Sequence, residues 1–422
     1  MKRHLRGKVV SAIDIGTTKI CVLIACIDSR GHPDIIGIGV QPSYGLKKGV
    51  VVNIQQTVQS IKEAVRIAQD MAGVTIDTTT VGIAGGHIKS YNSTGVVAIK
   101  GKDISQNDID RVIDTAKAIP IPQDQEILHI LPQYFRVDGQ EYVLDSLGMY
   151  GVRLEAQIHI ITGAIASVQN IIKSCELAGI NVADIVLEQI ASADAVLTQS
   201  ERELGVGIID IGGGTSDFAV YKDARIRHSK VLPIAGNHFT NDLAIGLRIS
   251  KSKAEELKKL YGSIALKQHT NFSNSFSQHN FNIDLEYEQQ IKSVELDTFT
   301  DILKYRAEEI FELFFDEIHE YKLKSFMPTG IVLTGGGSLL PGIKEVAEDR
   351  LNLPVRLGIP ITQASEENPI LPDSLKSPIY STGYGLLLYA MKDHNDKILG
   401  SPHDSSIKKV FRRMKSWIYD FL

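Results

Sequence analysis

A short motif that occurs twice, about half the chain apart, constrains the fold more than any other feature. The first copy, VVSAIDIGTTKICVLIA, spans residues 9–25, and the second, GVGIIDIGGGTSDFAVYK, spans residues 205–222. Both consist of an apolar run, then Asp-Ile-Gly, then small or hydroxylated residues, then a second apolar or alternating run. The runs are short and rich in β-branched residues, which favours strands over helices. The duplication predicts two related halves, each built on a strand–turn–strand unit.

The turn of each copy has the composition of a phosphate-binding loop. Glycine lets backbone amides approach an anion closely, hydroxyl groups add donors, and one lysine adds a cation suited to a β-phosphate. An aspartate near the end of each leading strand would face its counterpart across a cleft and hold a hydrated Mg²⁺. The candidate binding residues are Asp14, Gly16, Thr17, Thr18, Lys19, Asp210, Gly212, Gly213, Gly214 and Thr215, with Asp14 and Asp210 at the metal.

Two other common nucleotide motifs are absent from the sequence. It contains no GxxxxGK[ST], hence no Walker A loop, and no GxGxxG that opens a helix, hence no dinucleotide fingerprint. A single Asp-Ile-Gly would be an ordinary β-turn, but that interpretation is much weaker for two copies in register. We therefore interpret the pair as phosphate loops.

A third glycine-rich segment, IVLTGGGSLLPG at residues 331–342, has the pattern of a buried strand, a turn and then a helix. Glycines at 335–337 remove side chains where a flat base and a ribose could lie. The charged helix predicted at 251–262 carries Glu255 and Lys258 on one face, where they could hydrogen-bond ribose hydroxyls. A solvated ion pair between them is the simpler alternative.

Together these segments resemble the superfamily of actin, sugar kinases and heat-shock chaperones. DIGTTK is similar to its first phosphate loop and DIGGGTSD to its second. TGGGSLLPG is similar to its adenosine loop, which adds Gly335, Gly336, Gly337 and Ser338 to the candidate binding residues. The resemblance covers nearly the whole chain in the right order. It implies an α/β fold of two ribonuclease-H-like halves around a cleft for ATP and Mg²⁺.

The same superfamily often places a glutamate or glutamine between the halves, where it orients the attacking water. The segment IVLEQIASADAVL, residues 185–197, resembles that connector. Glu188 is the best match for the catalytic position, and Gln189 is the second candidate. A carboxylate that simply favours the start of a helix explains Glu188 equally well. Any ATP hydrolysis is expected to be slow.

More narrowly, the chain resembles the FtsA family of bacterial cell-division proteins in length, motif spacing, an insertion between Val81 and Gly163, and an amphipathic tail. The resemblance implies subdomain 1A in residues 1–82, 164–204 and 379–391, an inserted subdomain 1C in 83–163, 2A in 205–235 and 326–378, and 2B in 236–325. In that family, 1C makes filament contacts and receives late division proteins, and 2B receives the C-terminal peptide of FtsZ.

The inserted segment also has a pattern of its own. Ser105 is a candidate helix N-cap, with Asp108 three residues later. A helix with one apolar face should follow, ending before Pro120, and a half-buried strand should cover 152–160. The apolar positions are Ile109, Val112, Ile113 and Ala116 in the helix, and Val152, Leu154, Ala156, Ile158 and Ile160 in the strand. No residue here has a catalytic pattern, so the unit suits a contact surface or a plain structural insertion.

The last sixteen residues have the spacing of an amphipathic helix, and residues 392–406 before them read as a flexible linker. The apolar face comprises Ile407, Val410, Phe411, Met414, Trp417, Ile418, Phe421 and Leu422, and the basic face Lys408, Lys409, Arg412, Arg413 and Lys415. A final helix docked on its own domain is the alternative. Large apolar side chains opposite five cations are typical of a helix that lies in an anionic membrane surface.

Composition excludes several other classes. The net charge of -5 gives no indication of a nucleic-acid partner, and three cysteines without CxxC spacing argue against disulfides or a zinc site. No apolar run approaches the roughly 18 residues of a spanning helix. We therefore predict an ATP-binding, filament-forming adaptor on the cytoplasmic face of the bacterial inner membrane at the septum. A pilus-assembly scaffold and a small-molecule kinase of the same fold are the alternatives, although the kinase lacks a clear catalytic aspartate.

Overall fold

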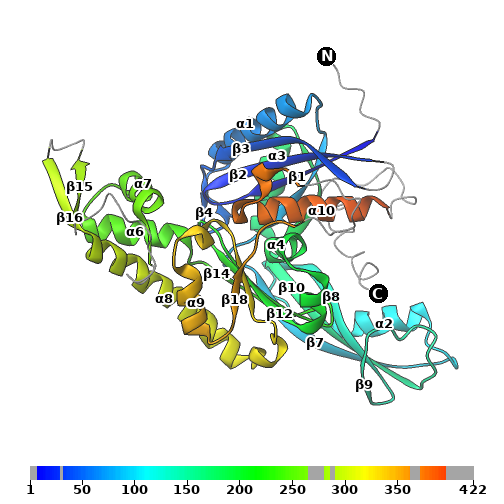
Figure 1. Cartoon of the computed structure of the whole chain (residues 1–422). Coiled ribbons are helices and arrows are strands. Elements are labelled where there is room, and N and C mark those ends of the chain that lie inside the picture. The colour runs from blue at the N-terminus through cyan, green and yellow to red at the C-terminus, as the bar shows by residue number, and fades with distance from the viewer. Residues whose placement is uncertain (1–6, 29–31, 265–279, 286–289, 362–370, 396–422) are drawn as a thin grey trace.

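The duplicated motif forms two five-stranded sheets with the same topology in the computed structural model, which describes residues 7–28, 32–264, 280–285, 290–361 and 371–395 (Figure 1). In each sheet three antiparallel strands are followed by two strands parallel to the first. The first sheet has the order β3 (Pro33–Pro42), β2 (Lys19–Ile27), β1 (Lys8–Ile15), β6 (Thr78–Ile83) and β11 (Asn181–Leu187). The second has the order β14 (Arg225–Leu232), β13 (Ser216–Lys222), β12 (Val206–Ile211), β17 (Ile331–Thr334) and β18 (Val355–Leu357).

The two hairpins that carry the motif are built alike. Asp14 pairs with Cys21 across the first, and Asp210 pairs with Asp217 across the second, so each predicted aspartate lies one residue before its strand ends. The Gly16 amide donates to the Lys19 carbonyl at 3.0 Å, and the Gly212 amide donates to the Thr215 carbonyl at 2.9 Å. The predicted strand–turn–strand unit is therefore confirmed in both halves.

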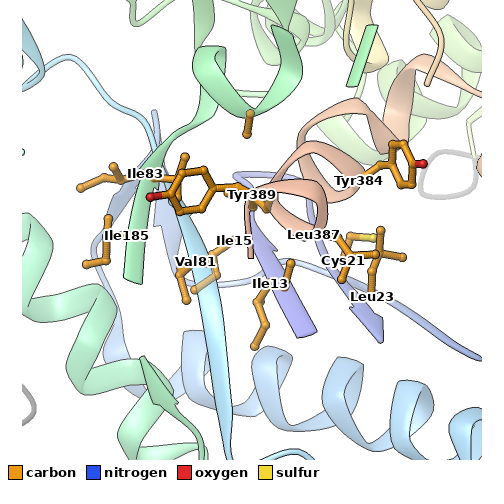
Figure 2. Close-up of a cluster of buried hydrophobic side chains, with 14 of the residues drawn as sticks. Ile13, Ile15, Cys21, Leu23, Val81, Ile83, Ile185, Tyr384, Leu387 and Tyr389 are labelled. Carbon is orange, nitrogen blue, oxygen red and sulfur yellow. The ribbon is translucent and has the colours of Figure 1, made fainter. Parts of the chain in front are cut away.

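Helices cover both faces of the first sheet. α1 (Ile54–Ala72) packs on β2 and β3 with α3 (Ile165–Leu177) beside it, while α10 (Ser381–Asn395) packs on β1, β2 and β6. α10 and α4 (Glu188–Val196) also pack against each other. Figure 2 shows part of the buried core, to which both the sheet and α10 contribute; its labelled residues are Ile13, Ile15, Cys21, Leu23, Val81, Ile83, Ile185, Tyr384, Leu387 and Tyr389. Continuous β-branched runs are what a sheet buried on both faces requires.

The second half carries its own helical layer, which shields a separate core of phenylalanines and aliphatic residues. A β-hairpin extends from this layer at the edge of the molecule (Figure 1). These elements are α6 (Gly236–Leu247), α7 (Lys251–Tyr261), α8 (Leu296–Glu320), α9 (Ile343–Leu351), β15 (Asn280–Leu285) and β16 (Gln290–Glu295). The short elements of the chain are β4 (Leu46–Lys47), β5 (Val50–Val51), α5 (Gln199–Leu204), η1 (Leu323–Phe326), η2 (Gly336–Leu339), η3 (Asp373–Leu375) and η4 (Pro378–Tyr380).

The inserted segment folds as a four-stranded sheet with one helix and a core of its own. Its elements are β7 (Lys89–Ala98), α2 (Gln106–Ala116), β8 (Gln125–Val137), β9 (Gln140–Val143) and β10 (Arg153–Ala164). Ser105 and Asp108 form the predicted capping box, and the four apolar positions predicted for α2 are buried. The prediction for Val152 is wrong, because β10 begins one residue later and Val152 is 74% exposed. The other four predicted strand positions are buried.

The insert contacts both halves through buried polar groups. The His129 Nε2 atom accepts a hydrogen bond from the Leu187 amide of the first half at 3.1 Å. The Gln133 side-chain amide donates to the Ile226 carbonyl on β14 at 3.0 Å. The His159 Nε2 atom lies 2.8 Å from Ser229 Oγ on the same strand. The insert therefore spans the two halves and is not attached to one of them alone.

The two buried histidines of the insert predict how stability depends on pH. Burial lowers the pKa of His129 and of His159 to about 3, and His228 adds to the effect on His159. Because both native pKa values lie below the unfolded value near 6.5, this stability is complete above pH 6.5 and is lost as pH falls toward 3. Between pH 7 and pH 5, we expect each histidine to remove about 2 kcal/mol of unfolding free energy.

Urea unfolding of wild type and His159→Gln at several pH values measures this loss. The variant should lose less stability on acidification, whatever its stability at pH 7. His319→Gln, which changes a histidine exposed on α8, is the matched control and should keep the wild-type slope. Equal slopes for wild type and His159→Gln would contradict the assignment of His159 as a neutral buried group.

The C-terminal predictions fall largely outside the described residues. α10 runs to Asn395, so the first four residues of the predicted linker 392–406 are helical. The rest of the linker and the predicted amphipathic helix 407–422 lie outside the described residues. In the part of the chain that the structure describes, no helix is long and apolar enough to cross a membrane.

Candidate functional site

A cavity of about 1680 Å³ lies between the two halves, and glycine loops from both line it. The structure brings together nearly all of the candidate binding residues, although they come from distant parts of the sequence. Those that line the cavity are Asp14, Gly16, Thr17, Thr18, Lys19, Glu188, Asp210, Gly212, Gly213, Gly214, Thr215, Glu255, Lys258, Gly335, Gly336 and Gly337. Ser338 is the exception. It is buried beneath the third loop, and its hydroxyl donates to the Gly335 carbonyl at 2.7 Å.

The two hairpin turns touch each other across the cavity. A Cβ atom on Gly213 would lie 2.3 Å from Thr18 Cγ2, and one on Gly214 would lie 2.3 Å from Thr17 Oγ1. A side chain at either glycine would displace the threonine opposite it, so the backbone of one loop faces the hydroxyl side chains of the other. This combination of backbone and hydroxyl groups suits phosphate oxygens.

The cation of the first loop is held by the aspartate of the same hairpin. Lys19 Nζ lies 2.6 Å from Asp14 Oδ2. Burial alone would lower the pKa of Lys19, but the Asp14 carboxylate, together with Cys21 and Asp210, raises the pKa above its ordinary value. Lys19 therefore stays charged and remains available to an anionic group in the cavity.

Asp210 occupies the equivalent position in the second half and has different partners. Its Oδ2 atom accepts hydrogen bonds from the hydroxyls of Ser192 and Thr382. Burial raises the pKa of Asp210, and these two hydrogen bonds oppose the increase. Mg²⁺ keeps much of its water shell and is usually held by one or two carboxylates together with phosphate oxygens. Asp14 and Asp210 meet that requirement from opposite sides of the cavity.

Asp217 also lines the cavity, and our sequence reasoning missed it. Its Oδ2 atom accepts a hydrogen bond from the Thr215 hydroxyl at 3.1 Å, while its buried Oδ1 atom has no hydrogen-bond partner among the described residues. Burial, and then the Asp210 carboxylate, raise the pKa of Asp217 well above its ordinary value. The hairpin register was the available signal, because residues directly opposite each other on paired strands share a face.

Glu188 is the first residue of α4 and reaches the cavity. Burial raises its pKa well above the ordinary value, and the carboxylates of Asp14, Asp217 and Asp210 add to the rise. A carboxyl group with a raised pKa is suited to proton transfer near neutral pH. Gln189 is fully buried in α4 and does not line the cavity. The geometry therefore favours Glu188 over Gln189 as the group that could orient water.

The expected adenosine side is built from α7 and the third glycine loop. Glu255 and Lys258 form an ion pair at 2.7 Å, and Lys258 Nζ also donates to the Gly236 carbonyl at 3.1 Å. The ion pair predicted by the simpler alternative is therefore present, and both residues also line the cavity, while their contact with ribose hydroxyls stays a prediction. Gly335 has a φ of +83°, and a Cβ atom there would lie 2.1 Å from Asp210 Oδ1. Only glycine allows the third loop to approach the second-half aspartate so closely.

Comparison with known sequences gives consistent matches along the chain. Residues 85–162 match the family model described as the SHS2 domain inserted in FtsA, and residues 207–385 match the model of the cell division protein FtsA. The cell division protein FtsA of Pseudomonas aeruginosa is 42% identical over 418 residues, which cover 98% of this chain and 98% of that protein.

Solved structures of low sequence identity share the fold. The PilM–PilN type IV pilus biogenesis complex contains a chain with a TM-score of 0.64 and 15% identity, over 90% of this chain and 98% of that one. MreB5 of Spiroplasma citri bound to ADP has a TM-score of 0.52 and 15% identity, over 92% and 99% of the two chains. These structural similarities confirm an actin-like fold, and at 15% identity they assign no function.

Proposed function

Because the chain belongs to the FtsA family of cell-division proteins, we propose that it binds Mg²⁺-ATP in its cleft, assembles into filaments on the cytoplasmic membrane and tethers the FtsZ ring there. The near-full-length match at 42% identity is the observation that carries this proposal. It favours cell division over the pilus scaffold and the sugar kinase, which share the fold alone.

The cleft supports the nucleotide part of the proposal. Two phosphate loops, a charged lysine and two opposed aspartates meet in one cavity large enough for a nucleotide. When bound, Mg²⁺ would neutralise phosphate charge, and Asp14 and Asp210 would hold its water shell. Glu188 would orient a water molecule, and hydrolysis would be slow and regulatory.

The tail supports the membrane part. Complete burial of a large apolar side chain contributes about 1.5–3 kcal/mol, and each basic residue near anionic lipid adds about 1 kcal/mol. Ordering a free peptide costs about 1–2 kcal/mol per residue and cancels most of this gain. One helix should therefore bind weakly, whereas several helices on one filament should bind far more tightly through effective concentration.

The subdomain division suggests which surface each partner would bind. The insert folds around its own core, as an autonomous contact module should, and late division proteins and filament neighbours would bind there. The layer formed by α6, α7 and α8 corresponds to the region that would receive the FtsZ C-terminal peptide. These contacts would occur together on the cytoplasmic face of the inner membrane, at the division septum.

Full-length protein on vesicles of phosphatidylglycerol and phosphatidylethanolamine tests the proposal. With Mg²⁺-ATP we expect filaments on the vesicles by electron microscopy, and recruitment of a fluorescent FtsZ C-terminal peptide to the lipid fraction. Without nucleotide both signals should fall several-fold. Phosphoryl transfer to a panel of sugars, with no filaments in any nucleotide state, would instead support the kinase.

A further inference from the structure

Hydroxyl groups on the two helices that join the halves both donate a hydrogen bond to the same oxygen of Asp210. Ser192 Oγ on α4 lies 2.5 Å from Asp210 Oδ2, and Thr382 Oγ1 on α10 lies 3.1 Å from the same atom. The two hydroxyl oxygens are 3.1 Å apart. Ser192 and Asp210 are buried, and both Asp210 and Thr382 line the cavity. These three groups therefore form a closed triangle at the wall of the cavity.

The helices that supply the hydroxyls are the connections between the halves. α4 follows the last strand of the first sheet and leads through α5 into β12, the central strand of the second sheet. α10 follows the second half in sequence but packs on β1, β2 and β6 of the first. They cross closely, because a Cβ atom on Gly385 would lie 1.7 Å from the Ala191 carbonyl oxygen. Ser192 is adjacent to this crossing point, so Asp210 is bonded to the crossing of the two connecting helices.

The hydroxyl protons decide which oxygen of Asp210 is free to face the cavity. Each hydroxyl has one proton, so a hydroxyl that donates to Asp210 Oδ2 cannot donate to its neighbour as well. When both hydroxyls donate to Oδ2, the Oδ1 atom accepts neither of these hydrogen bonds. It lies next to Gly335, where only a glycine leaves room for it. The carboxylate is thereby fixed in one orientation before any ligand arrives, which lowers the cost of ordering it on binding.

We propose that Ser192 and Thr382 are positioning residues that orient Asp210 toward a divalent cation and so connect cation binding to the α4–α10 crossing. This inference rests on the proposed Mg²⁺-nucleotide function. It adds that the affinity for the cation depends on the positions of the two connecting helices, because a shift of either helix would remove a hydrogen-bond donor from Asp210. Neither hydroxyl contacts the reacting atoms, so neither is a catalytic residue.

The neighbouring serine provides a matched control. Ser381 is buried one residue before Thr382, and its hydroxyl lies 2.7 Å from Thr334 Oγ1. Ser381→Ala therefore removes a buried hydroxyl bond at the start of the same helix without removing a donor from Asp210. Thr382→Ser keeps the hydroxyl and serves as the conservative variant.

The test measures metal and nucleotide separately on the full chain. Mn²⁺ affinity is measured by electron paramagnetic resonance with saturating ADP, and ADP affinity by calorimetry in EDTA. The double variant Ser192→Ala/Thr382→Val should bind Mn²⁺ about 10-fold more weakly, with ADP affinity in EDTA within about 2-fold of wild type. Ser381→Ala and Thr382→Ser should retain Mn²⁺ affinity.

Wild-type Mn²⁺ affinity in the double variant would overturn the positioning role while leaving the proposed function standing. A double variant and a Ser381→Ala variant that lose ADP and Mn²⁺ affinity equally would also overturn it, since the effect would then be general loosening of the helix. A wild-type chain that binds neither ADP nor Mn²⁺ would refute the proposed function itself, and the inference with it.

Discussion

Asp210→Ala is expected to weaken Mg²⁺-dependent ATP binding by about 100-fold, or about 2.7 kcal/mol, while the protein stays folded. The loss follows because this carboxylate is one of two placed to hold the cation's water shell. The fold should survive, since burial disfavours the Asp210 charge and the carboxylates of Asp14 and Asp217 lie nearby. The two hydroxyls left behind, 3.1 Å apart, can bond to each other.

Isothermal titration calorimetry with Mg²⁺-ATP, and again with ATP in EDTA, measures this effect. The EDTA titration should change little, because Asp210 would act through the cation. Asp70→Ala is the control, since it removes a carboxylate that is 66% exposed on α1 and does not line the cavity. Circular dichroism checks folding of both variants. Wild-type Mg²⁺-ATP affinity in Asp210→Ala would refute its metal role.

Trp417→Glu is expected to release the protein from anionic vesicles, reducing the bound fraction at least 10-fold. Helical spacing places Trp417 on the apolar face, at its edge, where its burial in lipid would contribute about 1.5–3 kcal/mol. A glutamate there loses that contribution and brings a negative charge to an anionic surface. Because a filament multiplies a weak single-helix affinity, the loss should grow with the number of subunits per filament.

Vesicle co-sedimentation of full-length variants measures the release. Ser416→Glu is the matched control: it adds the same charge on the opposite face of the predicted helix, and it should weaken binding by no more than about 1 kcal/mol. Deletion of residues 407–422 should remove binding altogether. Unchanged co-sedimentation of the truncated protein would refute the assignment of the tail to the membrane. It would favour a tail that docks on its own domain.

Local pattern was sufficient to predict the elements that carry the site. Both hairpins, the helix at 251–262, and the capped helix of the insert follow from spacing, glycine placement and capping residues, which act within a few positions of the chain. The two hairpin loops that line the cavity could be located for the same reason, since their glycines and hydroxyls are contiguous. Val152 was misplaced because alternation continues one residue past the point where the backbone leaves the sheet.

The remaining site residues are brought together by strand register and by tertiary packing, which no local sequence pattern encodes. Asp217 shares the face of Asp210 only through the antiparallel register of one hairpin. Thr382 reaches Asp210 from 172 positions away, and His129 of the insert reaches the amide before Glu188 from 58 positions away. Ser338 belongs to the third loop in sequence, yet its hydroxyl points back into that loop and leaves the cavity to its glycines.

The sequence by itself determined two Asp-Ile-Gly hairpins and an inserted α+β unit, and it predicts an amphipathic tail, because each of these depends on the spacing of neighbouring residues. Only the tertiary structure decided which groups meet at the cleft: the Asp217 carboxylate, the two hydroxyls that donate to Asp210, and an insert in contact with both halves. Those contacts arise where helices cross and sheets meet, and the distance between two side chains there is set by packing of the whole core rather than by their separation along the chain.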